Sequence, residues 1–210
     1  MIANTISIVR VALAVGVLWL LGVFSPDAAN SITPDMMSWC AILTAVVIWL
    51  DGVDGFVARK LNECSPAGAV IDIAGDRIVE QIYWLGFAIL GWIPSWMPVV
   101  VIIRGVAIDA ARGLALKQGY TAFGESTMQR HWLGVWLVSS RASRWLYAAS
   151  KALAFVLLIA GHHSGWQAAF PALVPFSLFC AWVAVIFCLL RGIPVLLESM
   201  ASNVTSLKED

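Results

Sequence analysis

Four aspartates stand close together in residues 51–76, which read DGVDGFVARKLNECSPAGAVIDIAGD. Asp51 and Asp54 are three residues apart and Asp72 and Asp76 four apart, so on helices each pair projects from one face. Two antiparallel neighbouring helices would bring all four carboxylates to one depth. Isolated charges are costly at low dielectric and like charges oppose one another's ionisation, and a divalent cation removes that penalty. Oxygen-only ligands indicate Mg²⁺, Mn²⁺ or Ca²⁺.

The residues between the aspartates suit a bound phosphate. Gly55 and Gly68 remove side chains where a ligand could approach the backbone, and Ala58 keeps the same helix face open. Arg59 supplies a planar, permanently charged fork that matches a pyrophosphate. The alternative is that Asp and Arg merely pair as ion bridges at helix ends. Four aspartates with glycines in register favour the phosphate site.

The spacing D-x-x-D-G-x-x-A-R-x8-G-x-x-x-D-x-x-x-D resembles the signature of the CDP-alcohol phosphotransferase family. Every specified position is filled, by Asp51, Asp54, Gly55, Ala58, Arg59, Gly68, Asp72 and Asp76. The resemblance implies that an acceptor hydroxyl attacks the β-phosphorus of a CDP-linked alcohol, usually CDP-diacylglycerol, and that CMP leaves. It also implies a homodimer.

The same resemblance assigns roles to these positions. The implied ligands of a Mg²⁺ or Mn²⁺ site are Asp51, Asp54, Asp72 and Asp76. Asp76 would also be the catalytic general base. The implied contacts to CDP come from Asp51, Gly55, Ala58, Arg59 and Gly68.

The elements that position this site are predicted to be membrane helices. The chain has 210 residues, of which 60% are hydrophobic and 12% charged, and its mean hydropathy is +0.85. Apolar runs of about 20 residues, long enough to cross a bilayer, lie near 6–24, 37–58, 69–92, 97–117, 146–162 and 172–196. We expect an all-α integral membrane protein, with a six-helix domain over 1–197 and a polar tail over 198–210. A net charge of +0 predicts no nucleic-acid partner.

The orientation follows from the basic residues. With a cytoplasmic N-terminus the outer loops are 25–36, 93–96 and 163–171, and these loops contain none of the 13 Lys and Arg residues. This predicts a multi-pass protein of a bacterial inner membrane or its equivalent, with the metal site at the cytoplasmic side. His162 and His163 then lie on the far side, where we expect a solvated turn. The segment 118–143 is too polar to span and predicts an interfacial helix.

The acceptor alcohol is indicated by basic residues inside or just before the later apolar runs, where charge is expensive unless it faces a polar cavity. These residues are Arg104, Arg112, Arg144, Lys151 and Arg191. Such a cluster suits a small acceptor that itself carries a phosphate. In the alternative, Arg144 and Arg191 extend to lipid headgroups and Arg104 pairs with Asp109.

The N-terminal segment resembles that of one subfamily within this family. Residues 4–10, NTISIVR, are similar to the N-x-L-T-x-x-R of phosphatidylglycerophosphate synthases, whose acceptor is glycerol 3-phosphate. In a second segment the chain differs, because Gly105, the residue after Arg104, stands where those enzymes have Glu. Inositol phosphate and a free alcohol such as serine therefore remain alternatives.

A membrane transporter is the competing class, since intramembrane acids and bases also line ion pathways. A transporter predicts charges spread along a path across the bilayer. Here the acidic residues gather toward one face, which favours an enzyme acting on CDP-diacylglycerol in the bilayer.

Overall fold

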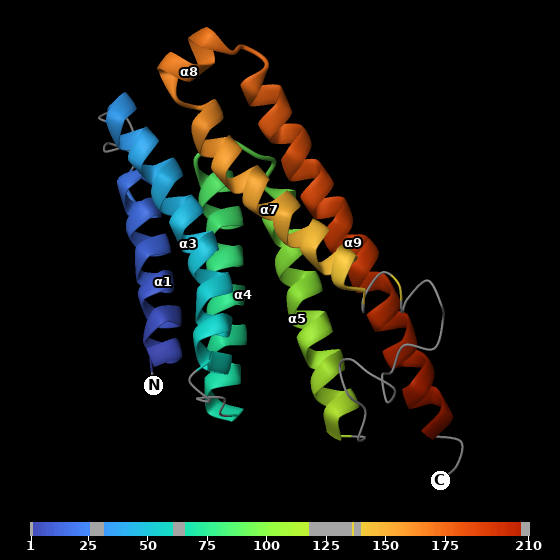
Figure 1. Ribbon diagram of the computed structural model, residues 1–210. Helices are drawn as coiled ribbons and strands as arrows, with labels where there is room; N and C mark the ends of the chain where they lie inside the picture. The colour runs from blue at the N-terminus through green and yellow to red at the C-terminus, as the bar shows by residue number, and fades with distance from the viewer. Residues whose placement is uncertain (1, 26–31, 61–65, 118–135, 137–139, 207–210) are drawn as a thin grey trace. The chain divides into compact units, whose positions relative to one another are not determined.

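The computed structural model describes residues 2–25, 32–60, 66–117, 136 and 140–206, and among these it contains helices and no strand (Figure 1). The long helices are α1 (Ile2–Leu20), α3 (Pro34–Lys60), α4 (Pro66–Ile89), α5 (Trp96–Lys117), α7 (Arg141–Gly161) and α9 (Leu173–Ser206). A short helix, α8 (Ser164–Ala169), joins the last two. The predicted all-α class is confirmed, and each apolar run of the sequence corresponds to one long helix.

Three of the described helices contain segments long and apolar enough to cross a membrane: Pro34–Gly52, Ala142–Gly161 and Leu173–Leu197. Thr5–Leu20 is apolar but shorter. In α4 and α5 the apolar sequence is interrupted by charges such as Asp76 and Arg104. Six spans therefore stay a prediction, and the three candidate spans agree with the expected integral membrane protein.

Large apolar side chains on the outside of the helices agree with a lipid environment. Trp49, Phe179 and Trp145 are between 61% and 70% exposed. Soluble proteins rarely show many such side chains together, because contiguous apolar surface promotes association in water. These faces are suited to acyl chains.

The described chain divides into two compact units. Unit 1 comprises Met1–Pro98 and Ala152–Ala181, and unit 2 comprises Val99–Lys151 and Trp182–Asp210. Helices α5, α7 and α9 each contribute residues to both units. The aspartates of the motif belong to unit 1, whereas the basic residues assigned to the acceptor belong to unit 2.

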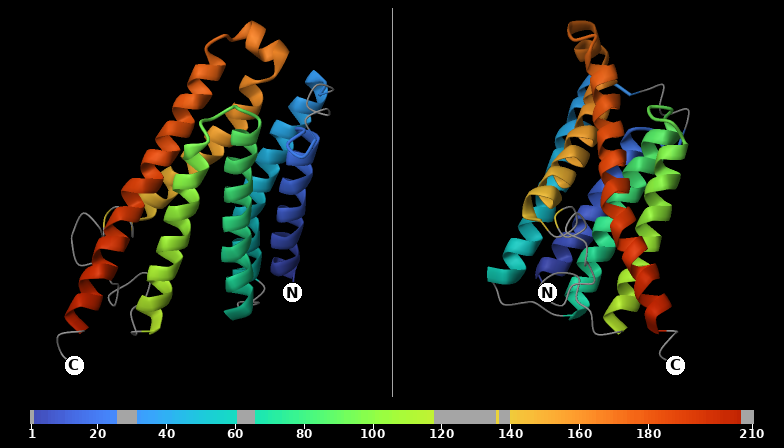
Figure 2. Two further views of the ribbon diagram at one scale, coloured as in Figure 1. Left: turned by 180° about the vertical axis from the view of Figure 1, so that it is seen from behind. Right: turned by 90° about the vertical axis from the view of Figure 1, so that its right-hand side faces the viewer.

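In unit 1, helix α1 packs against both α3 and α4, and the three lie side by side in each view (Figure 2). A glycine with positive φ follows the end of both α1 and α4, Gly22 at 75° and Gly91 at 72°. The amides of the next residues, Val23 and Trp92, return to carbonyls at the ends of the two helices, Leu18 and Phe87. Glycine permits this left-handed conformation without a Cβ clash, which is why these helices stop there.

The core of unit 1 is aromatic. The rings of Tyr83 and Trp84 on α4 each lie 5.2 Å from the ring of Phe155 on α7. The hydroxyl of Tyr83 is 3.0 Å from that of Thr44 on α3, and both residues are fully buried. This hydrogen bond satisfies two polar groups that would otherwise be costly inside the unit.

Unit 2 is built on a close approach of α5 and α9. Ile108 and Ala111 on α5 pack with Val195 on α9. A Cβ added to Gly192 would come within 2.9 Å of Arg104, so the absence of a side chain there makes room for this arginine.

Several details differ from the sequence expectations. His163 is buried rather than solvated, because its ring accepts a hydrogen bond from the amide of Trp166 and caps α8. Helix α9 continues to Ser206, past the predicted domain end at 197, and that boundary stays a prediction. Most of the expected interfacial helix, 118–135 and 137–139, lies outside the described residues.

Candidate active site

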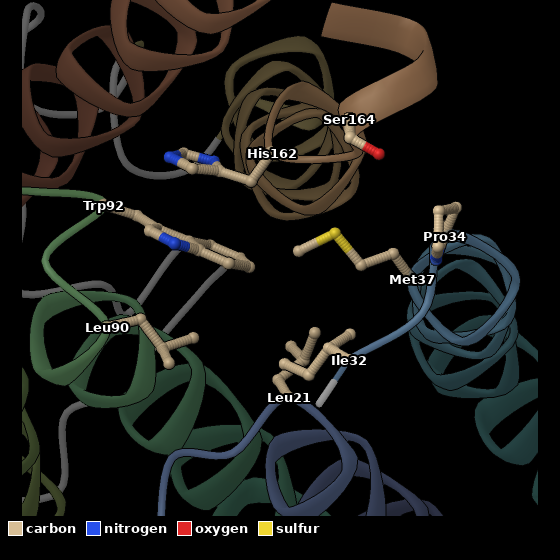
Figure 3. A pocket seen from close by; sticks show the side chains of 8 residues that line it. All are labelled: Leu21, Ile32, Pro34, Met37, Leu90, Trp92, His162 and Ser164. Atoms are coloured by element: carbon tan, nitrogen blue, oxygen red, sulfur yellow. The ribbon is translucent and has the colours of Figure 1, made fainter. Parts of the chain in front are cut away.

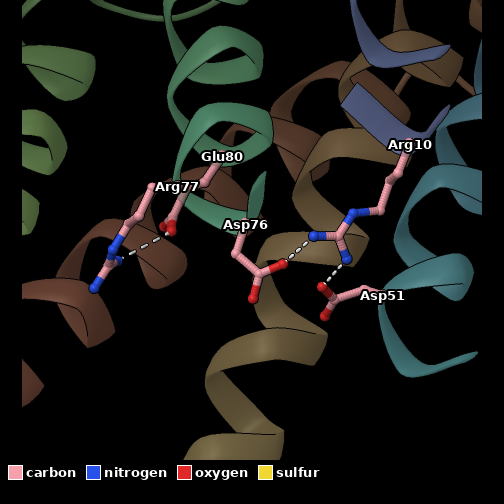
Figure 4. Close-up of polar contacts among 5 residues, drawn as sticks. All are labelled: Arg10, Asp51, Asp76, Arg77 and Glu80. Carbon is pink, nitrogen blue, oxygen red and sulfur yellow. Dashed lines mark hydrogen bonds and ion pairs between the residues drawn. The ribbon is translucent and has the colours of Figure 1, made fainter. Parts of the chain in front are cut away.

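The acidic site of unit 1 is organised around a buried arginine. Arg10 on α1 is 1% exposed, and its two terminal nitrogens donate hydrogen bonds to Asp51 on α3 and to Asp76 on α4 (Figure 4). The two carboxylates are about half exposed, at 52% and 47%. Arg10, which is distant in sequence from both aspartates, thus joins the carboxylates of two consecutive helices.

Asp72 lies one turn before Asp76 on α4 and is half-buried. Its Oδ1 atom is buried. No set of three acidic, His or Cys side chains in the described part of the chain is close enough to hold a metal. The side chain of Asp54, the fourth predicted ligand, lies outside the described part.

The predicted CDP contacts are only partly described. Asp51 has the position given above, and Gly68 lies in the first turn of α4. The backbone of Gly55, Ala58 and Arg59 is part of α3. Their side-chain surroundings lie outside the described residues, so their roles stay predictions.

A second charged cluster, in unit 2, surrounds the ring of Tyr147 on α7. The Lys151 Nζ lies 4.6 Å from the ring centroid, and the guanidinium carbons of Arg191 and Arg104 lie 5.3 and 5.9 Å from it. Tyr147 and Arg191 are 8% and 9% exposed. Cations over an aromatic face are attracted by its quadrupole, so the ring holds three positive side chains from three helices in one place. We call Arg104, Lys151 and Arg191 the basic cluster.

The two other basic residues predicted for the acceptor are Arg144 and Arg112. Arg144 lies one turn before Tyr147 on α7, and its side chain is exposed. The side chain of Arg112 lies outside the described part of the chain.

A pocket of about 330 Å³ in unit 1 contains none of the predicted site residues (Figure 3). Its lining includes Met37, Trp92 and His162, and the rings of Trp92 and His162 stack with centroids 4.2 Å apart. Because the described residues of this lining include no carboxylate, they are unsuited to a hard divalent cation.

Sequence reasoning missed two residues of these arrangements. Arg10 enters the sequence expectations only as part of residues 4–10, and Tyr147 is not among the predicted site residues. The available signal for Arg10 was a lone arginine within an apolar run, which requires a buried partner of opposite charge.

The fold and the acidic motif define a class of membrane transferases. A profile of the CDP-alcohol phosphatidyltransferase family matches residues 1–191. The chain belongs to this family, which confirms the resemblance of the motif and makes the protein an enzyme rather than a transporter.

Three relatives of this chain have different named activities. The CMP-forming cardiolipin synthase of Streptomyces coelicolor is 25% identical over 186 residues, which cover 89% of this chain and 77% of the relative. The CDP-diacylglycerol–glycerol-3-phosphate 3-phosphatidyltransferase of Bacillus subtilis is 32% identical over 72 residues, 34% of this chain and 37% of the relative. The archaetidylinositol phosphate synthase of Aeropyrum pernix is 30% identical over 113 residues, 50% of this chain and 56% of the relative.

Proposed function

We propose that this chain transfers the phosphatidyl group of CDP-diacylglycerol to the hydroxyl of glycerol 3-phosphate and releases CMP. The oxygen of the acceptor hydroxyl bonds to the β-phosphorus, and the bond from that phosphorus to the oxygen bridging to CMP breaks. The hydroxyl proton passes to a carboxylate. The products are a phosphatidyl ester of glycerol 3-phosphate and CMP.

The observation that carries the choice of a phosphate-bearing acceptor is the basic cluster around Tyr147. Three cations lie within 5.9 Å of the centroid of one ring. A free alcohol such as serine has no phosphate group that could bind to them. A phosphate offers several acceptor oxygens, and charge-assisted hydrogen bonds to arginine are about twice as strong as neutral ones. Burial of Tyr147 and Arg191 strengthens this preference, because a cation away from water gains more from an anionic partner.

Asp76 is proposed as the general base. Its carboxylate is about half exposed, so an acceptor hydroxyl can reach it, and its contact with Arg10 fixes its orientation. Arg59, Gly55, Ala58 and Gly68 are proposed to hold the CDP moiety, the arginine by a two-pronged contact with the diphosphate.

The donor set fits a hard divalent cation, Mg²⁺ or Mn²⁺. Asp51, Asp54, Asp72 and Asp76 offer only carboxylate oxygens, which are the ligands that such cations prefer. When bound, such an ion would neutralise charge that develops on the diphosphate and on the departing CMP. We propose these four aspartates as its ligands.

Inositol phosphate is the second candidate acceptor. It carries the same phosphate group, so the basic cluster suits it equally, and the relative from Aeropyrum pernix is named for an inositol phosphate product. A direct comparison of acceptors separates the two candidates.

The test offers the purified protein radiolabelled CDP-diacylglycerol with Mn²⁺ and, in parallel, glycerol 3-phosphate, inositol phosphate, inositol, serine and phosphatidylglycerol. We expect a new lipid with glycerol 3-phosphate and a stoichiometric amount of CMP. A product with serine or inositol alone would refute a phosphate-bearing acceptor, and a product with phosphatidylglycerol alone would indicate a lipid acceptor.

Replacing Asp72 by Asn tests the acidic site separately. We expect CMP release to fall by about 10³-fold or more, because an amide cannot replace a charged ligand at a metal that stabilises the transition state. Asp35→Asn is the matched control, since Asp35 is an exposed carboxylate in the first turn of α3. If the Asp72 variant keeps the rate of the control, the carboxylate site is not where the reaction occurs.

The topology and assembly are also proposals. The absence of Lys and Arg from 25–36, 93–96 and 163–171 supports a multi-pass chain whose N-terminus and active site face the cytoplasm. An impermeant label on a cysteine introduced at Gln167 would react from outside the cell if this is correct. The family supports a homodimer, which cross-linking in native membranes would detect.

A further inference from the structure

Arg10 is an unusual residue for the centre of an apolar helix. It is 1% exposed, and both of its terminal nitrogens are committed to carboxylates of other helices (Figure 4). Gly75 on α4 lies against it, so that a Cβ added there would be 3.6 Å from Arg10 Nη2. The guanidinium therefore reaches the acidic site past Gly75, a position of α4 that has no side chain.

Charge explains why an arginine is needed at this place. Asp51 and Asp76 would repel each other if both were ionised with nothing between them. A buried guanidinium is equally costly without negative partners. The positive charge of Arg10 and the negative charges of Asp51 and Asp76 thus compensate one another. The ion pairs among these three side chains connect α1 with α3 and α4.

The same two carboxylates are among the proposed ligands of the divalent cation. A doubly charged ion bound to Asp51 and Asp76 would lie close to the guanidinium that now bonds them. Like charges at such short range repel strongly in a partly buried setting. Each carboxylate oxygen that accepts from Arg10 is also less available as a metal ligand.

We propose that Arg10 is an internal counter-cation that competes with the divalent metal for Asp51 and Asp76, an inference that rests on the proposed metal site. Without metal, Arg10 holds the two carboxylates and stabilises the packing of α1 on α3 and α4. When metal binds, Arg10 gives up at least one of its carboxylate contacts. The affinity for metal is therefore lower than four aspartates alone would give.

The test measures Mn²⁺ binding to the full chain in detergent without any substrate, from the loss of the free-ion electron paramagnetic resonance signal. Arg10→Met keeps an unbranched apolar stem and removes the charge. We expect the variant to bind Mn²⁺ at least about tenfold more tightly than the parent, equal to about 1.4 kcal/mol of binding free energy. We also expect its thermal unfolding midpoint to fall in EDTA and to recover most of that loss in saturating Mn²⁺.

Arg77→Met is the matched control. Arg77 follows Asp76 on α4, but its ion pair is with Glu80 at 3.6 Å, and it has no role in the proposed site. We expect its Mn²⁺ affinity to equal that of the parent. Equal gains in the two variants would show a general charge effect and would refute competition by Arg10.

Weaker or unchanged Mn²⁺ binding in Arg10→Met would also overturn the inference, because it would mean that Arg10 positions the carboxylates for the metal or is indifferent to it. If this variant does not fold, Arg10→Lys replaces it. A lysine is a point charge that lacks the planar fork needed to hold two carboxylates. We expect Arg10→Lys to bind Mn²⁺ more tightly than the parent, and equal or weaker binding refutes competition.

Failure of this inference is distinguishable from failure of the proposed function. A parent protein that binds no Mn²⁺ and releases no CMP contradicts the proposed function itself. A parent that binds Mn²⁺ and releases CMP, with an Arg10 variant of unchanged affinity, contradicts only the competition.

Discussion

Replacing Tyr147 by Leu should weaken the binding of the acceptor more than it disturbs any other step. The substitution keeps an apolar side chain at a site that is 8% exposed, so the packing of α7 is largely retained. What it removes is the aromatic face against which Lys151, Arg191 and Arg104 are held.

The size of the effect follows from the three distances. Lys151 at 4.6 Å and Arg191 at 5.3 Å lie well within the range of a cation–π contact, each contributing about 1 kcal/mol. Arg104 at 5.9 Å is close to the limit of that range, and its contribution is about 0.5 kcal/mol. The variant therefore loses roughly 2 to 3 kcal/mol of interaction among these groups. If half of this lost interaction energy weakens the binding of the acceptor, the KM for the acceptor rises about tenfold.

The assay is steady-state release of CMP with glycerol 3-phosphate varied at fixed CDP-diacylglycerol, and then the reverse. We expect the KM for the acceptor to rise while the KM for CDP-diacylglycerol changes by less than about twofold. Tyr147→Phe keeps the ring and is the control, expected to resemble the parent. An unchanged acceptor KM in a stably folded Leu variant, or an equal defect in the Phe variant, would refute the role of the ring.

Two further changes test the packing around the sites. Gly192→Ala places a Cβ within 2.9 Å of Arg104 and should raise the acceptor KM and cost about 1 to 3 kcal/mol by overpacking, partly offset by better helix propensity. Gly113→Ala, in open space on α5, should be neutral or slightly stabilising, and thermal unfolding of the two variants compares them. Thr44→Val should lower the free energy of unfolding by about 1 to 3 kcal/mol, because it leaves the buried hydroxyl of Tyr83 without its 3.0 Å partner. The double variant with Tyr83→Phe should recover part of that loss, and a double variant as unstable as the sum of the single variants would contradict this explanation.

The helices of this protein could be read from local sequence. Each long helix coincides with an apolar run, because a segment that crosses or lies in a bilayer must satisfy its own backbone hydrogen bonds. Local sequence marks only some of the helix ends. Gly22 and Gly91 mark the ends of α1 and α4, whereas nothing local to α9 predicted that it continues to Ser206.

The burial of His163 shows a different limit. Polar residues in a loop between helices predict a solvated turn, yet this ring caps α8 and is 8% exposed. Capping depends on the helix that follows, and a six-residue helix is too short to have a clear periodic signature.

By itself the sequence determined the family and the chemistry, because the motif of four aspartates, its glycines and Arg59 lies within one short stretch whose spacing is readable. It also determined which residues are basic inside apolar runs. Only the tertiary structure decided which of these charges meet. Arg10 is 41 residues from Asp51 and 66 from Asp76, and the basic cluster comes from three helices. Such contacts depend on how helices pack, and no local pattern of residues encodes that directly.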